Sequence, residues 1–184
     1  MNSIKYLFEI EKKPRKGLLP VEWVVMGYML LTLLLILFTY TKMQDPEPML
    51  WDRFRIVMMM LALWGVYRMI PCRFTHFCRI GAQLMLLPLW YPETYLLNRI
   101  FPNLDHIFAA YEQQLFGCHP ALTFAQAWSH PVFSELMHLG YASYFPMIPI
   151  ITLFYFFCRY KEFDRTAFII LTSFFVFYVI FILL

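Results

Sequence analysis

The stretch Trp23–Tyr40, WVVMGYMLLTLLLILFTY, contains no charged side chain over 18 residues. At 1.5 Å per residue, a helix of this length is about 27 Å long, close to the ~30 Å hydrocarbon core of a bilayer. The stretch follows a basic segment, but it is longer than a signal-peptide core and no small-residue cleavage site comes after it. We therefore predict a permanent first membrane span.

The composition of the whole chain extends this prediction. Of its 184 residues, 61% are hydrophobic and 20% aromatic, whereas an average soluble domain is ~45–50% apolar. A soluble fold of this length could not bury so much apolar surface, so the bilayer is the expected solvent. The net charge of +3 comes from short basic clusters between apolar runs. Such clusters favour a role in membrane topology over nucleic-acid binding.

Four further apolar segments follow the first one. We predict spans at about 49–70, 80–91, 136–158 and 167–184. The segment 80–91 is short, contains Pro88 and is followed directly by Pro92, so it either crosses the membrane or is re-entrant. The segment 136–158 should kink at Pro146 and Pro149. The predicted fold class is all-α: a polytopic membrane helix bundle of about five transmembrane helices, with an amphipathic helix at its outer face.

Lysine and arginine are distributed unevenly among the connecting segments. The N-terminal arm, residues 1–20, carries five and the connectors 68–79 and 159–165 three each, against four in the alternate loops. The positive-inside rule then predicts a cytoplasmic N-terminus in a bacterial inner membrane, and five crossings place residues 95–130 outside. The arm is either a short interfacial helix or a disordered tail. Residues 21–184 should form one membrane domain.

The outer segment contains a predicted amphipathic helix, Leu104–Phe116. Its apolar residues recur with a period of 3.6, and Gly117 suits the position just after its end. Asp105 and Glu112 are seven residues apart and share the opposite face. These two acids either face water or line the mouth of a pocket for a lipid headgroup.

The fourth predicted span carries a polar stripe. Ser134, His138 and Tyr141 recur at helical spacing, and Tyr144 lies beside them. Because ionisable groups facing lipid are costly, the stripe should face protein or a wet cavity. His138 is either hydrogen-bonded between packed helices or part of a binding site.

A metal or haem site has little support in the sequence. Cys72, His76 and Cys78 supply three candidate ligands, whereas structural zinc normally has four. Haem ligation by His76 and His138 would rest on two isolated histidines. We find no glycine-rich phosphate loop, HExxH, Gly-x-Ser-x-Gly or CxxC motif. No metal and no cofactor are predicted.

Two segments together resemble a known family. LDHIFAAYEQQLFGCHP, residues 104–120, and YASYFPMIP, residues 141–149, resemble the N-terminal half of inositol phosphorylceramide synthases and their bacterial relatives. These enzymes belong to the type 2 phosphatidic acid phosphatase superfamily. The likeness lies in Asp105 near a helix start, Glu112 before a Leu-Phe-Gly turn, and a Tyr-x-x-Tyr pair before prolines.

The resemblance implies a six-helix membrane enzyme that acts on lipid phosphates at the outer face. In such enzymes one histidine attacks phosphorus, a second protonates the leaving group, and basic residues hold the phosphoryl oxygens. Their Pro-Ser-x-His and Ser-Arg-x5-His-x3-Asp motifs do not occur here, so no catalytic residue is assigned. Because the sequence stops at Leu184 within an apolar run, we expect the catalytic half to lie in further sequence.

We therefore expect the membrane module of a lipid phosphatase or phosphotransferase, with membrane lipids and a lipid phosphate substrate as partners and without nucleic acid. The sequence does not indicate an oligomeric state. The alternative is a non-catalytic multi-pass scaffold or partner subunit. The expected substrate-binding residues are Asp105, Glu112, His138, Tyr141 and Tyr144.

Overall fold

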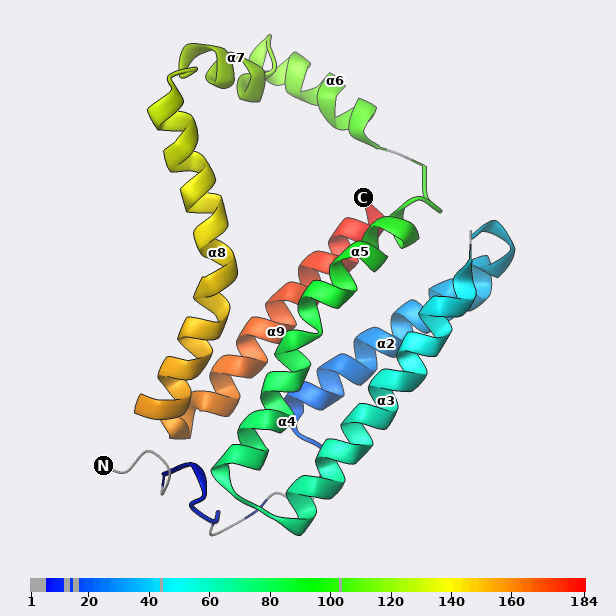
Figure 1. Cartoon of the computed structure of the whole chain (residues 1–184). Helices are drawn as coiled ribbons and strands as arrows, with labels where there is room; N and C mark the ends of the chain where they lie inside the picture. Colours follow the sequence, from blue (N-terminus) through cyan, green and yellow to red (C-terminus); the bar gives the residue numbers. More distant parts are fainter. Residues whose placement is uncertain (1–5, 12–13, 15–16, 44, 103) are drawn as a thin grey trace.

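A computed structural model describes residues 6–11, 14, 17–43, 45–102 and 104–184 (Figure 1). Within these ranges the chain is helical and contains no β-sheet, which confirms the predicted all-α class. The elements are α2 (Pro20–Thr39), the 3-10 turn η1 (Tyr40–Lys42), α3 (Pro46–Met69), α4 (Arg73–Met85), α5 (Leu87–Asn98), α6 (Asp105–Phe116), α7 (Pro120–Ala127), α8 (Pro131–Cys158) and α9 (Tyr160–Leu183).

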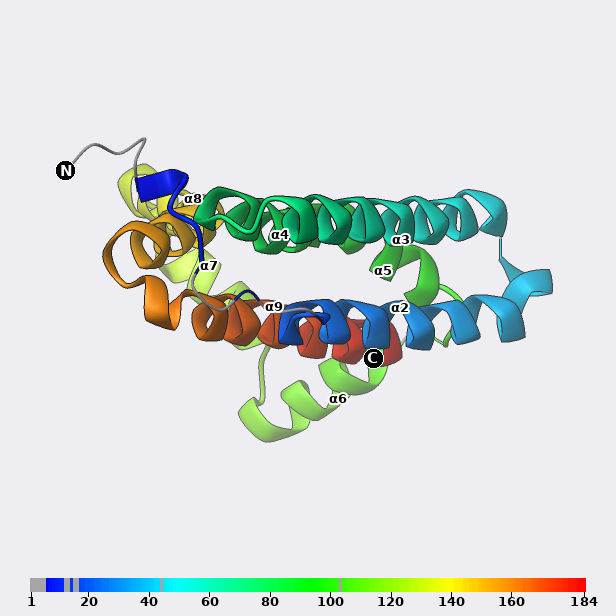
Figure 2. The ribbon, with the colours of Figure 1, turned by 90° about the horizontal axis from the view of Figure 1, so that it is seen from below.

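Five helices, α2, α3, α4, α5 and α9, form a bundle (Figure 1). Seen from below, α3 and α4 lie in one layer and α2 and α9 in the other (Figure 2). Between the layers, apolar side chains such as Val25, Trp90 and Leu171 are buried in one continuous core. The apolar faces of α2 and α9 are thus partly used for packing within the protein.

The segment 80–91, predicted as one short span, is divided between α4 and α5 at Leu86. Pro88 is the second residue of α5, where the missing N–H of proline costs no helical hydrogen bond. Pro92 lies inside α5, which continues past it. Hence only the first of the two prolines coincides with a break.

Helix α8 leaves the bundle. It packs against α9 near Cys158 and diverges from it toward α7, while α6 and α7 lie across the end of the molecule (Figure 1). Its two parts, Pro131–Tyr144 and Pro146–Cys158, are bent by 43° relative to each other. This confirms the kink predicted at Pro146, whereas the second part continues through Pro149 to Cys158 as one helical segment. We call α6, α7 and the first part of α8 the arch.

Two of the described helical segments, Pro20–Lys42 and Tyr160–Leu183, are long and apolar enough to cross a membrane. Helix α8 is a third if its two bent parts form one span. Helix α3 has 24 residues but carries charged side chains, and α4 and α5 are each too short to cross ~30 Å alone.

The described part of the N-terminal arm lies across the base, the end of the molecule where the α3–α4 and α8–α9 connectors meet (Figure 1). Ile10 forms an isolated antiparallel bridge with Cys72. The Glu11 N–H donates to the Pro71 carbonyl at 2.9 Å, and the Arg73 N–H donates to the Glu9 carbonyl at 3.2 Å. The five basic residues of the arm that were counted for the topology, Lys5, Lys12, Lys13, Arg15 and Lys16, lie outside the described residues.

The bridge at the base can be tested with a disulfide. Ile10 and Cys72 form a non-hydrogen-bonded antiparallel pair, for which Cα atoms lie ~4.5 Å apart, within the range that a disulfide needs. We expect Ile10→Cys to cross-link to the native Cys72 under mild oxidation, as detected by mass spectrometry of the linked peptides. Ile10→Ser is the matched control and should give no link. A link from position 10 to Cys78 in place of Cys72 would contradict this arrangement.

Candidate functional site

The structure places the two predicted acids of the arch on α6. Asp105 is its first residue and is exposed, and Glu112 is half-buried. Glu112 accepts a hydrogen bond at 3.1 Å from Nδ1 of His119, which was not among the predicted site residues. The chain can turn back this way because Gly117 ends α6 with a φ of +66°, a conformation that favours glycine.

The other three predicted residues lie on α8. His138 is exposed, and its Nδ1 donates to the Ser134 carbonyl of its own helix at 2.9 Å. Among the described residues, His138 is thus hydrogen-bonded within its own helix and not to another helix. Tyr141 is exposed, and the Tyr144 ring lies 5.8 Å from that of Phe174 on α9.

The predicted residues thus belong to one arch but do not form one cluster. The acids lie on α6, the tyrosines and His138 on α8, and α7 lies between these helices (Figure 1). No described residue of α6 or α7 is buried. Every residue from Ser134 to Tyr144 is exposed as well.

The most enclosed charges lie inside the bundle, and the sequence analysis did not identify them. Arg79 on α4 and Glu22 on α2 both have fully buried side chains. Arg79 Nε and Nη2 donate to the two Glu22 carboxylate oxygens at 2.5 and 2.6 Å, a bidentate pair. Glu22 also accepts the Leu19 N–H at 2.7 Å, and Arg79 Nη2 donates to the Gly17 carbonyl. The first turn of α2 is thereby fixed to α4.

A second buried pair joins α3 to α5. Arg53 Nη1 donates to Glu93 Oε1 at 2.6 Å and to the Met49 carbonyl at 2.7 Å. The Arg53 guanidinium carbon lies 5.5 Å from the centre of the Trp90 ring, a cation–π distance. Only 6% of the Arg53 side chain is exposed, so this charge faces protein.

A third polar group lies at the base. His76 Nε2 is 2.7 Å from Asp164 Oδ1, and His76 Nδ1 is 3.9 Å from Glu11 Oε1. The Tyr67 and Tyr160 hydroxyls both donate to the Glu11 carboxylate. The N-terminal arm therefore inserts an acid between residues of α3, α4 and α9.

These three groups share one face of α4 and α5. His76, Arg79, Gln83, Trp90 and Glu93 recur at multiples of the helical repeat. The signal was present in the sequence as polar residues at i, i+3 and i+7 from His76. Sequence reasoning missed it because residues 68–79 were interpreted as a basic connector and not as the start of a helix.

Several buried polar atoms of this interior have no hydrogen-bond partner among the described protein groups. Leaving one such group unpaired costs about 1–3 kcal/mol, and more for a charged group. The atoms are Tyr28 Oη, Arg53 Nε and Nη2, His76 Nδ1, Arg79 Nη1, both amide atoms of Gln83, Trp90 Nε1 and Thr172 Oγ1.

A metal has no site in the described part of the chain, where no group of three or more His, Cys, Asp or Glu side chains is arranged to hold one. Of the candidate ligands Cys72, His76 and Cys78, His76 is bonded to Asp164. His76 and His138 lie toward opposite ends of the molecule, on the base end of α4 and the α7 end of α8 (Figure 1). They cannot share a haem in this arrangement.

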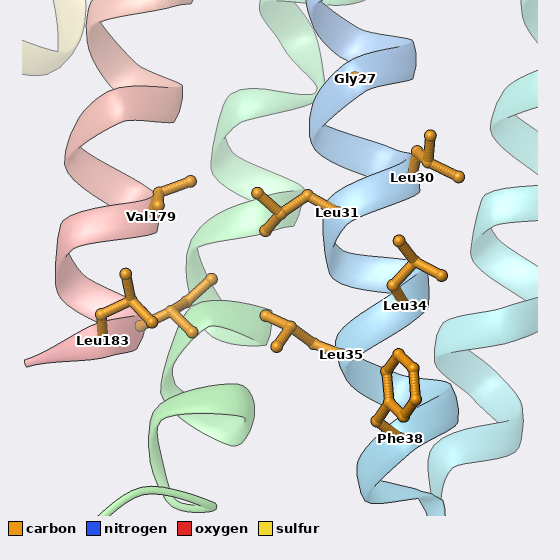
Figure 3. A pocket seen from close by; sticks show the side chains of 9 residues that line it. Gly27, Leu30, Leu31, Leu34, Leu35, Phe38, Val179 and Leu183 are labelled. Carbon is orange, nitrogen blue, oxygen red and sulfur yellow. The ribbon is translucent and has the colours of Figure 1, made fainter.

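A groove of about 480 Å³ runs between α2 and the last turns of α9 (Figure 3). It is lined by Gly27, Leu30, Leu31, Leu34, Leu35, Phe38, Val179, Ile182 and Leu183. None of these side chains can donate or accept a hydrogen bond. The groove therefore suits hydrocarbon and offers nothing for the chemistry of a phosphate.

The contribution of the Glu22–Arg79 pair to folding stability can be measured by breaking the pair. Arg79→Met leaves a buried carboxylate without its partner, which should cost about 3–5 kcal/mol of folding free energy. Adding Glu22→Gln removes that charge and should recover most of the loss. Thermal unfolding in detergent, followed by tryptophan fluorescence, measures both variants.

The control is Arg55→Met, which breaks the exposed pair with Asp52. It should change the melting temperature little, because exposed pairs contribute little to stability. Equal shifts of the melting temperature for Arg55→Met and Arg79→Met would show that the buried pair contributes no more to stability than the exposed pair.

Comparison with known proteins assigns nothing to this chain. No family model matches it, and no curated protein and no solved structure matches it either. What the protein does has to be inferred from its residues and their geometry.

Proposed function

We propose that this chain is the membrane module of a lipid phosphatase or phosphotransferase of the type 2 phosphatidic acid phosphatase superfamily, in its inositolphosphotransferase branch. The observation that carries the proposal is the position of the two family-like segments. Residues 104–120 form α6 and its turn into α7, and residues 141–149 lie on α8. Both therefore belong to or adjoin the arch, at a distance from the base.

In this proposal five helical rods cross the bilayer: α2, α3, α4 with α5, α8 and α9. Helix α3 is long enough, at about 36 Å for 24 residues. Three of the charges on these helices are turned inward, since Arg53 pairs with Glu93 and Arg79 with Glu22. The exposed charges of α3, Glu47, Asp52, Arg55 and Arg68, lie in its first ten and last two residues, toward its ends. Charges buried against each other do not meet lipid, so they do not prevent these helices from spanning it.

The orientation follows from the base. Two of the basic segments, 68–79 and 159–165, with three Lys or Arg residues each, come together there (Figure 1). By the positive-inside rule the base is cytoplasmic, in a bacterial inner membrane, and the arch is outside. Exposed aromatic side chains of the arch, among them Phe108, Tyr111 and Trp128, suit the headgroup level.

The arch would form walls of the headgroup site. Carboxylates repel phosphate but accept hydrogen bonds from hydroxyl groups, so Asp105 and Glu112 fit a hydroxylated headgroup such as a polyol. His138, Tyr141 and Tyr144 can donate hydrogen bonds to a phosphate or to its ester oxygens. The reactive histidines of the family would be supplied from outside these 184 residues.

Turnover tests this assignment. In the full-length protein, His138→Phe should lower phosphate release from a lipid phosphate about tenfold or more without loss of expression. The basis is that a hydrogen bond to a charged group contributes about 1.5–3 kcal/mol, and 1.4 kcal/mol is a factor of ten.

Leu139→Phe, at the next position, which is also exposed, is the control and should leave turnover unchanged. If His138→Phe released phosphate as fast as Leu139→Phe and the unsubstituted protein, His138 would have no role in substrate binding. No lipid-phosphate turnover in the full-length protein would favour a non-catalytic scaffold.

Two native cysteines test the orientation. Cys118 lies in the turn between α6 and α7, Cys158 ends α8 at the base, and both are exposed. A membrane-impermeant maleimide added to intact spheroplasts should label Cys118 and leave Cys158 unmodified until the membrane is opened. Cys118→Ser and Cys158→Ser variants assign each labelled peptide. The reverse labelling order would place the arch in the cytoplasm and remove the proposed site from the outer face.

A further inference from the structure

The bundle encloses a group of hydrogen-bond donors around one aromatic ring. Trp90 on α5 is in contact with Tyr28 of α2, at 5.3 Å between ring centres, and with the Arg53 guanidinium of α3, at 5.5 Å. Glu93, one helical turn after Trp90, binds Arg53. We call these four residues the Arg53 site.

The site has more donors than acceptors. Arg53 Nη1 is bonded to Glu93 and to the Met49 carbonyl, but its Nε and Nη2 have no acceptor among the described protein groups. Trp90 Nε1 has none either, and the Tyr28 hydroxyl is unpaired. Four N–H bonds therefore lack an acceptor, and the tyrosine can both donate and accept.

The positions of these groups are fixed by packing. The Tyr28 ring is stacked on Phe175 of α9, with ring centres 4.3 Å apart and the planes 11° from parallel. Arg53 is held by its two bonds through Nη1. The donors cannot turn toward bulk water without breaking these contacts, because Tyr28, Arg53 and Trp90 are all buried.

The charge balance and the enclosure decide the class of ligand. Glu93 neutralises Arg53, so the site has no excess positive charge that would hold an anion. It is also closed to larger molecules, because its side chains are almost entirely buried. Water is small and neutral, accepts two hydrogen bonds and donates two, and is the usual partner of buried polar groups that protein atoms leave unpaired.

We propose that the Arg53 site binds ordered water inside the bundle, bridging the free N–H groups of Arg53 and Trp90 to the Tyr28 hydroxyl. The bundle core is then wet at this level between α2, α3 and α5. The site is formed by the bundle and not by the arch, so it does not depend on the proposed lipid phosphate activity.

The sign of one mutational effect tests the proposal. If water is bonded to the Tyr28 hydroxyl, Tyr28→Phe removes a satisfied hydrogen bond and should lower the melting temperature by about 2–4 °C. If the hydroxyl is unpaired, the same change removes a buried polar group without a partner, and the melting temperature should rise or stay constant.

Radiolytic footprinting supplies the second measurement. Hydroxyl radicals generated from bound water should oxidise Tyr28 and Trp90 in the intact protein in nanodiscs, although both side chains are buried. Tyr178 is the matched control, because it is equally enclosed and its hydroxyl donates to the Leu87 carbonyl at 2.9 Å. Oxidation of Tyr28 and Trp90 several times that of Tyr178, with a lowered melting temperature for Tyr28→Phe, is the expected result. Oxidation no greater than that of Tyr178, or a melting temperature that rises or stays constant, would overturn the proposal.

Discussion

The bidentate contact between Arg79 and Glu22 is the interaction on which the rest of the bundle depends. It joins the first turn of α2 to the middle of α4, and the same carboxylate caps the start of α2 through the Leu19 N–H. Both charges are fully buried, so each needs the other: a buried ion is tolerated only when it is paired and hydrogen-bonded. The pair therefore fixes the relative position of two helices that apolar packing alone would let slide.

The sequence predicted the helical class, the position of the first long apolar helix, the end of α6 at Gly117 and the kink at Pro146. These are local properties, set by runs of apolar residues, glycine and proline. The last apolar helix was predicted too short, because α9 begins at Tyr160 and includes most of the predicted connector 159–165. The sequence did not predict which charges are buried. Arg79 was counted in the basic connector 68–79, and Arg53, at the outer end of the second span, was one of the four basic residues counted on the opposite side. The structure places both inside the bundle. Pairing across helices depends on which faces meet, and a single sequence does not contain that information directly.

For the candidate site, too, the sequence predicted local features but not the arrangement of helices. Asp105, Glu112, His138, Tyr141 and Tyr144 were chosen for their spacing within single helices, and each lies on the helix where it was expected. Spacing does not determine how α6 and α8 are placed relative to each other, and the structure shows these residues spread along the arch. The Glu112–His119 contact depends on the turn at Gly117. The signal in the sequence was Gly117: a turn at this residue brings His119, two positions later, back toward Glu112.

The Glu22–Arg79 pair also has a consequence for biogenesis. The two residues are 57 positions apart, so the ribosome delivers the acid well before its arginine. During this interval α2 has an uncompensated carboxylate at its leading end, which favours the membrane surface over the interior. In the proposed five-span arrangement the first helix would then settle fully only once α4 has emerged, so that α2, α3 and α4 would enter the bilayer in one concerted step.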